Sequence, residues 1–365
     1  MKIAMLYPNL PPFDWTWHDQ RGLGGSENGM LRTAQHLAQL GHEVHVFNRA
    51  ELPITQAGEN LWWANLSFFN PKEYYDVVYS LRHKEPFEQY HPLNTKLKVL
   101  FLADTESKGL GETVHQLKVD LVMAVSHWQI EKIQLEEHIH NDHWMVTSNG
   151  VMSLRDETIS VNKVQGRCIF LSTPERGLTP LLDIWPKIKS AVPWASLHLY
   201  SSFMGWGVSR EENENMCRDI YARIDSMANL GVLNCKHGAY EEICLAQSQA
   251  EAYLYPSDFY ETCGMGILES MYTGTIPVAT GRAGLLEKIT NNVTGKLIPA
   301  YGADSPRYQK MFAEAAIDVL KRVVDDNAWK SAMREACMKY ASQFTYPILV
   351  REWVNEWQRR IKEKS

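Results

Sequence analysis

The stretch of residues 255–279, YPSDFYETCGMGILESMYTGTIPVA, decides the fold because it holds most of a strand–helix–strand unit. An apolar run over residues 252–255 is stopped by a proline, and a second apolar run covers residues 276–279. Between them, residues 264–273 form a short helix pattern that ends at Gly274. Two apolar runs joined through a helix predict two parallel strands of one sheet.

The same alternation continues along the whole chain. Further short apolar runs lie at 3–7, 44–47, 77–81, 99–102, 121–125 and 144–147, and then at 169–171, 197–200 and 296–298. Several are apolar nearly throughout, which is typical of strands that helices cover on both faces. The stretches between them have helical spacing, as in residues 28–40, which end at Gly41. This alternation in two successive halves predicts two doubly wound α/β domains.

The length of 365 residues also favours two domains. The polar stretch 149–167 has no clear period, so we expect a domain boundary there. We predict a first domain over residues 1–160 and a second over 161–346. A final helix over 347–365 is expected to pack back on the first domain. Its basic end, 359–364, is interpreted as a solvated helix end, with a peripheral membrane contact as the alternative.

Composition excludes several classes of function. Lys and Arg number 37 against 43 Asp and Glu, and the net charge of −6 argues against binding of a nucleic-acid polymer. It leaves room for a local basic pocket that takes a phosphorylated small molecule. No run of eighteen apolar residues occurs, so no membrane span is expected. The six cysteines are scattered without a C-x-x-C pair, which favours a reducing, cytoplasmic location.

A glycine-rich segment, RGLGGSENG over residues 21–29, lies between the first predicted strand and the first long helix. Gly24 and Gly25 allow the backbone to come close to a ligand, and the helix that follows offers unpaired amides and a partial positive charge. The spacing matches neither G-x-G-x-x-G nor a Walker A loop. The segment therefore predicts an anion site at a strand end, and a tight strand-to-helix turn is the structural alternative.

The stretch 255–279 carries a second and richer set of groups. Glu261 lies on the predicted loop, glycines open the helix at Gly264 and Gly266, and Glu269 lies within the helix. Amides at a helix start suit a diphosphate, and carboxylates accept hydrogen bonds from sugar hydroxyls. One site could therefore hold a ribose, a diphosphate and a hexose in a row. Glu261 could instead serve only as a helix cap, whereas packing alone explains Glu269 poorly.

The seven-residue separation of Glu261 and Glu269 resembles the E-x7-E signature of retaining GT-B glycosyltransferases, in particular glycosyltransferase family 4. Four further landmarks of that family are similar in order, at residues 2–46, 148–151, 283–287 and 294–297. The resemblance covers most of the chain. It implies a GT-B fold, in which two doubly wound Rossmann-like domains face each other across a cleft, one for the acceptor and one for the nucleotide-sugar donor.

The resemblance also implies roles for individual residues. Glu269 would bind the ribose hydroxyls, Glu261 would contact hydroxyls of the transferred sugar, and Arg176 would stabilise the leaving diphosphate. Contacts to the base are expected within residues 200–209. The implied catalytic residues are Glu261, Asp104 and Arg176. The implied donor-binding residues are Gly24, Gly25, Arg176, Glu261, Thr262, Cys263, Gly264, Met265, Gly266 and Glu269.

The sequence departs from the family pattern at three places. A second basic residue, usual about one turn before Arg176, is missing. Ala103 stands where many members have a histidine in the first domain, so Asp104 is the ionisable group left at that place; Asp104 could also be a helix cap. Met152 replaces an aspartate that often follows N-G-V.

Other conspicuous residues have simpler interpretations. His138, His140 and His143 resemble a metal cluster, but a solvated connector is the preferred interpretation. His115 is interpreted as a surface residue of a helix rather than as a replacement for the missing histidine. The aromatic pairs at 62–63 and 74–75 are expected in a core or interface rather than as sugar-stacking surfaces.

Together these features predict a retaining hexosyltransferase. It would move a hexose from a UDP- or GDP-sugar to an acceptor hydroxyl of an unidentified glycan, lipid or small molecule. No Asp-x-Asp metal motif is present, so neither a metal nor another cofactor is expected. The alternatives are a nucleotide-sugar-binding protein of GT-B fold that does not transfer, a nucleotide-sugar epimerase and a retaining phosphorylase.

Overall fold

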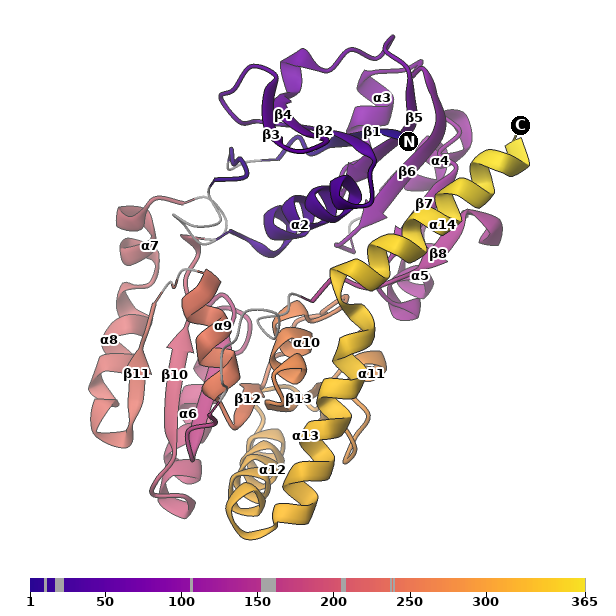
Figure 1. Ribbon diagram of the computed structural model, residues 1–365. Helices are drawn as coiled ribbons and strands as arrows, with labels where there is room; N and C mark the ends of the chain where they lie inside the picture. The colour runs from indigo at the N-terminus through magenta and orange to yellow at the C-terminus, as the bar shows by residue number, and fades with distance from the viewer. Residues whose placement is uncertain are drawn as a thin grey trace. The chain divides into compact units, whose positions relative to one another are not determined.

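The computed structural model describes residues 1–9, 12–16, 23–105, 108–151, 162–204, 208–236, 238 and 240–364. The chain divides into two compact units (Figure 1). Described residues up to Gly150, together with those from Phe344 onwards, form the first unit, and those from Val151 to Gln343 form the second. Each unit is built on a largely parallel sheet with helices around it, which confirms the predicted α/β fold class.

The sheet of the first unit has the strand order β3-β4-β2-β1-β5-β6-β7-β8. Its strands are β1 (Lys2–Leu6), β2 (Glu43–Asn48), β3 (Thr55–Gly58), β4 (Leu61–Asn65), β5 (Tyr75–Leu81), β6 (Thr95–Leu102), β7 (Leu121–Ala124) and β8 (Trp144–Val146). Only the edge pair β3–β4 is antiparallel among the described strands. The helices are α2 (Gly25–Gln39), α3 (Glu85–Gln89), α4 (Leu110–Gln116), α5 (His127–Gln134) and α14 (Tyr346–Lys364).

The sheet of the second unit is parallel in every described pair, with the order β11-β10-β9-β12-β13-β14. Its strands are β9 (Arg167–Leu171), β10 (Ser196–Tyr200), β11 (Val232–Asn234), β12 (Ala252–Tyr255), β13 (Ile276–Gly281) and β14 (Lys296–Pro299). The helices are α6 (Leu178–Ala191), α7 (Arg210–Met216), α8 (Arg218–Ser226), α9 (Tyr240–Gln249), α10 (Met265–Tyr272), α11 (Leu285–Lys288), α12 (Pro306–Asp325) and α13 (Asn327–Ala341).

Each sheet has one place where the strand order reverses. In the first unit the chain leaves β1 towards β2 and later returns to β5 on the other side of β1. In the second unit it leaves β9 towards β10 and returns to β12. Open α/β sheets bind ligands at such switch points, beside the carboxyl ends of the strands. The segments that follow β1, β5, β9 and β12 are therefore the places to look for functional groups.

Three strands, β3, β4 and β11, were not predicted from the sequence. β4 contains the Trp62–Trp63 pair: the side chain of Trp63 is fully buried, and Trp62 stacks on His45 with ring centroids 5.0 Å apart. Tyr75 is likewise buried at the start of β5, whereas Tyr74 is exposed. The structure thus places one member of each aromatic pair in the core of the first unit.

The last helix, α14, belongs to the first unit and runs along it in yellow in Figure 1. Its buried Trp353 donates a hydrogen bond to the Thr147 hydroxyl at 2.7 Å. Near its end, the Arg360 guanidinium donates to the carbonyl oxygens of Asp120 and Asp142, each at 2.7 Å. The expected solvated helix end is therefore only partly correct, because part of the basic stretch is bound to carbonyls of the first unit.

Two general features concern the apolarity of the helices and the pairing of the cysteines. In the described ranges, no helix combines the length and apolarity that crossing a membrane requires. None of the six cysteines, all of which lie in the described ranges, forms a disulfide, and all except Cys235 are buried.

Candidate functional site

The edge of the second unit at β9 and β12 gathers most of the predicted site residues. Because β9 and β12 are neighbouring parallel strands, the segments that follow them reach the same edge of the sheet. Arg176 lies on the segment after β9, and Glu261 lies on the loop after β12. A hydrogen-bonded ion pair of 3.2 Å joins the Arg176 guanidinium to the Glu261 carboxylate. Two residues 85 positions apart in the sequence are thus brought into direct contact.

Two aromatic side chains fix this ion pair. The buried Tyr255 donates its hydroxyl hydrogen to the Glu261 carboxylate at 2.5 Å, and burial raises the pKa of Tyr255 above its ordinary value. The guanidinium of Arg176 lies over the ring of Phe259, 3.9 Å from its centroid. The side chain of Glu261 is 14% exposed and that of Arg176 is 28% exposed. Both groups are therefore held in place and still accessible to a ligand.

Helix α10 follows this loop directly in the sequence. Its N-cap is Gly264, whose φ of 75° lies in the left-handed region that favours glycine. A Cβ atom at this position would also approach a methyl group of Leu285 to 2.5 Å. No side chain caps the helix, so the first amides, including those of Met265 and Gly266, lack a capping side chain. Glycine is favoured at position 264 because of its positive φ and because the backbone there packs closely against Leu285.

Glu269 lies on α10, with its carboxylate largely removed from water. Burial raises the pKa of this carboxyl group from 4.5 to about 7. Its hydrogen-bond partner is the Gln247 amide, 3.4 Å away, which is a long and weak contact. Among the described residues, no cation forms an ion pair with it. A carboxylate in this state is costly unless something else donates hydrogen bonds to it.

The other predicted residues of this loop are described mainly by their backbones. The side chains of Thr262 and Cys263 are buried. The amide of Gly284 donates to the Glu261 carbonyl at 2.9 Å, and a side chain at Gly284 would collide with the Thr262 carbonyl. The segment after β13 thus packs against the backbone of the Glu261 loop and donates a hydrogen bond to it.

Arg282 is a contact of this site that sequence reasoning missed. Its guanidinium donates to the Asp258 carbonyl at 2.7 Å and lies 4.5 Å from the centroid of the Tyr260 ring. Asp258 in turn accepts a hydrogen bond from the Ala303 amide at 2.6 Å. The position of Arg282 directly after a strand of the same sheet could have been read from the sequence. Its contact with Asp258 on the loop could not.

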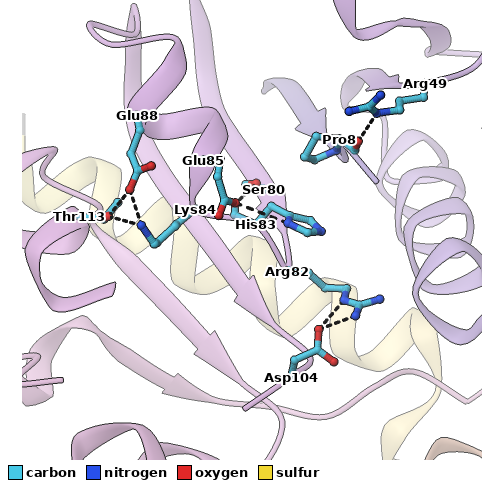
Figure 2. Close-up of polar contacts among 10 residues, drawn as sticks. All are labelled: Pro8, Arg49, Ser80, Arg82, His83, Lys84, Glu85, Glu88, Asp104 and Thr113. Carbon is cyan, nitrogen blue, oxygen red and sulfur yellow. Dashed lines mark hydrogen bonds and ion pairs between the residues drawn. The ribbon is translucent and has the colours of Figure 1, made fainter. Parts of the chain in front are cut away.

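The remaining predicted residues, Gly24, Gly25 and Asp104, belong to the first unit, at its β1–β5 switch point. Gly24 is the N-cap of α2, again without a capping side chain, and Gly25 is its first residue. Asp104 follows β6 and forms an ion pair of 2.6 Å with Arg82, the residue after β5 (Figure 2). Arg82 also donates to the Ser26 hydroxyl at 3.2 Å, so it links this carboxylate to the start of α2.

Arg82 was not predicted as a site residue. Its φ of 67° is unusual for a residue with a side chain, and such strained backbone is common at functional sites. Nearby, the buried Glu27 carboxylate accepts a hydrogen bond of 2.6 Å from Tyr7, and burial raises its pKa. The His83 ring lies edge-on to Tyr7, and burial lowers the pKa of its imidazole. The first unit therefore carries its own polar cluster at a switch point.

The histidine-rich connector does not form a metal site in the described parts of the chain, where no group of three or more His, Cys, Asp or Glu side chains is placed to hold an ion. His115 contacts the His138 carbonyl at 2.8 Å, and its ring lies 6.2 Å from that of His143. Two sequence expectations, on Gly205 and Gly207 within 200–209 and on Met152, lie outside the described residues.

Part of the second unit matches a known family model. Residues 229–342 match the family model "Glycosyl transferases group 1", which spans the Glu261 loop and α10. No curated protein sequence matches the chain.

Solved structures extend the likeness to the whole chain. A sucrose-phosphate synthase from Thermosynechococcus elongatus is similar with a TM-score of 0.71 at 14% identity, covering 99% of both chains. A glycosyltransferase from Rickettsia africae is similar with a TM-score of 0.68 at 16% identity, covering 99% of this chain and 98% of that one. Anabaena HepE, solved in complex with UDP and glucose, has a TM-score of 0.65 at 14% identity, covering 98% of this chain and 100% of HepE. Residues 229–342 therefore resemble the glycosyl transferases group 1 family, and the chain as a whole has the fold of the GT-B glycosyltransferases.

Proposed function

We propose that this protein is a retaining glycosyltransferase that moves a hexose from a nucleoside-diphosphate sugar to an acceptor hydroxyl. The observation that carries the proposal is the Glu269 carboxylate, which is largely removed from water, has a pKa raised to about 7 and has only a weak amide contact. Vicinal ribose hydroxyls would supply the hydrogen bonds that it lacks. Anabaena HepE, which has this fold, is solved in complex with UDP and glucose, and this supports a nucleotide-sugar donor.

The other groups of the edge would then have separate tasks. The uncapped start of α10 and the Arg176 guanidinium would bind the diphosphate, which becomes more negative as the sugar departs. Glu261, oriented by Tyr255, would accept hydrogen bonds from hydroxyls of the hexose. In this proposal Arg176 and the helix amides provide the positive charge, so the reaction requires no metal.

Binding of the donor has a consequence for the Arg176–Glu261 pair. If Arg176 turns to the diphosphate and Glu261 to the sugar, the 3.2 Å contact between them is exchanged for two contacts to one ligand. Each new contact is a charge-assisted hydrogen bond, worth about 1.5–3 kcal/mol. Catalysis would rest on positioning and on stabilisation of the leaving diphosphate.

A second candidate is a protein that binds a nucleotide sugar without transferring it. The ion pair between Asp104 and Arg82 favours it, because a carboxylate engaged at 2.6 Å is less available for chemistry on a substrate. This candidate predicts binding of the donor and no consumption of it in the presence of any acceptor.

The test is a calorimetric titration of the full chain with UDP, GDP, UDP-glucose and GDP-mannose. Wild type is compared with Glu269→Ala and with Glu314→Ala, a control that removes an exposed carboxylate from α12 of the same unit. We expect one nucleotide series to bind wild type and the control, and to lose at least tenfold in affinity in Glu269→Ala. If no nucleotide or nucleotide sugar binds wild type, the proposed function is wrong.

A further inference from the structure

A hollow in the first unit lies between α3 and α4 and has no role in the site described above. Its volume is about 330 Å³, and it is lined by Lys84, Glu88, Gly109, Glu112, Thr113, Gln116 and Leu117. Lys84 and Gly109 are the N-caps of α3 and α4. Lys84 is two residues from Arg82, so their Cα atoms are at most roughly 7 Å apart. One end of the hollow is therefore close along the chain to the segment that follows β5.

One wall of the hollow is a preformed polar triad (Figure 2). The Lys84 ammonium lies 2.5 Å from the Glu88 carboxylate, and the Thr113 hydroxyl donates to the same carboxylate oxygen at 2.6 Å. These contacts lower the pKa of Glu88, so its carboxylate is ionised at neutral pH. Both hydrogen bonds end on Oε1 of Glu88. Within the described residues, Oε2 of Glu88 has no protein donor and is available to accept from a ligand.

The other wall is the exposed face of α4. The Gln116 amide nitrogen donates to Oε1 of Glu112 at 2.9 Å, which holds the two side chains side by side. In the described part of the chain, the second carboxylate oxygen of Glu112 and the amide oxygen of Gln116 have no donor and remain as acceptors. Counting both walls, hydrogen-bond acceptors outnumber donors, so the hollow suits a ligand that donates many hydrogen bonds.

The charge of the lining excludes the ligands that a lysine would otherwise suggest. One lysine faces two glutamates, which leaves an excess negative charge and disfavours phosphates and carboxylates. The start of α4 adds no anion site, because Glu137 already accepts from the amides of Gly109 and Gly111, each at 2.7 Å. Leu117 is the one sizeable apolar side chain of the lining, which disfavours a lipid chain.

We propose that this hollow binds a neutral sugar unit of the acceptor. A sugar ring presents several O–H donors on a small body, and a volume of about 330 Å³ lies in the range of small-ligand sites. The proposal rests on the proposed transferase function and adds to it that the acceptor is a saccharide. Binding of a non-reacting sugar supplies energy for positioning the reacting one.

The experiment is saturation-transfer NMR on the full chain with excess UDP present. Maltose, lactose and chitobiose are the neutral probes, and glucose and glucose 6-phosphate form a matched neutral and anionic pair. Wild type is compared with the double variant Glu112→Ala/Gln116→Ala, whose two sites are exposed on α4. Glu131→Ala, an exposed carboxylate of α5 outside the hollow, is the control. Thermal unfolding checks that each variant is folded.

We expect at least one disaccharide to give signals with wild type and the control, and these signals to fall at least fivefold in the double variant. Glucose 6-phosphate should give weaker signals than glucose. Absence of any disaccharide signal, a signal that the double variant retains, or stronger signals from glucose 6-phosphate would each overturn the inference. UDP affinity, measured by calorimetry on the same samples, distinguishes failure of the saccharide site from failure of the proposed donor site. UDP binding without sugar binding refutes only the saccharide site, whereas sugar binding without UDP binding refutes only the donor site.

Discussion

Replacement of Glu269 by glutamine measures two effects of this carboxylate separately. One is its cost to the stability of the folded protein, and the other is its contribution to nucleotide binding. Burial raises the pKa of Glu269 from 4.5 to about 7, so the folded protein binds more protons than the unfolded chain between these two values. The free energy of unfolding therefore falls as the pH rises through this window. At 1.36 kcal/mol per pH unit the full cost is roughly 3 kcal/mol. Because the residue is still partly exposed, we expect about 1–2 kcal/mol.

Glu269→Gln keeps the shape of the side chain and removes the charge. Without a nucleotide, we expect the variant to be more stable than wild type by about 1–2 kcal/mol at pH 8. At pH 4, below both pKa values, the gap should nearly vanish, because Glu269 is then mostly protonated in the folded and in the unfolded state. Urea unfolding at both pH values measures this, with Glu314→Gln as the exposed control.

The same variant should bind the nucleotide more weakly. Loss of a charge-assisted hydrogen bond to ribose costs about 1.5–3 kcal/mol, or roughly 10- to 100-fold in affinity. Calorimetry with the nucleotide that binds wild type measures the change. A variant that gains no stability at pH 8 and binds the nucleotide as tightly as wild type would refute the reasoning.

Three further predictions concern other residues. Arg176→Lys should lower turnover of the donor at least tenfold although the charge is kept, because an ammonium does not reproduce the bidentate contact of a guanidinium. Steady-state kinetics measure this change. Unchanged turnover would argue against a role of Arg176 at the diphosphate. Gly264→Ala should destabilise the protein by about 1–3 kcal/mol in urea unfolding, because φ is 75° and Leu285 is in the way; a change below 0.5 kcal/mol, on the order of a neutral surface substitution, would contradict this. Burial lowers the pKa of Lys163 to about 7, so the unfolded chain binds more protons than the folded protein above this pH. The free energy of unfolding of wild type, measured relative to Lys163→Met, should therefore rise by about 1 kcal/mol or more between pH 7 and pH 10. A difference that does not vary with pH would show that Lys163 titrates normally.

The elements that were predicted correctly are those whose signal is local. The strands around Glu261 are apolar runs bounded by proline or glycine, and α10 begins at a glycine that the backbone requires. A strand buried on both faces reads as apolar throughout, so the parallel core was visible in the sequence. The edge strand β3 was missed because its sequence, TQAG, is mostly polar. The short strand β4 was missed because its Trp62–Trp63 pair was interpreted only as part of a core or interface.

The contacts that were missed depend on which strands are neighbours. Arg82 and Asp104 are 22 positions apart, and they meet because β5 and β6 are adjacent in the sheet. Arg282 reaches Asp258 because β13 lies next to β12. A sequence pattern shows that each of these residues follows a strand, but it does not give the strand order. Asp104 was singled out without its partner for this reason.

The most direct test of the central claim is a crystal structure of the chain with the nucleotide sugar that binds it most tightly. We predict the ribose hydroxyls within hydrogen-bond distance of Glu269 and the diphosphate at Arg176 and the first amides of α10. Sugar hydroxyls should lie at Glu261, with its 3.2 Å contact to Arg176 broken or lengthened. A nucleotide sugar bound elsewhere, with Glu269 still buried and without a ligand, would contradict the account.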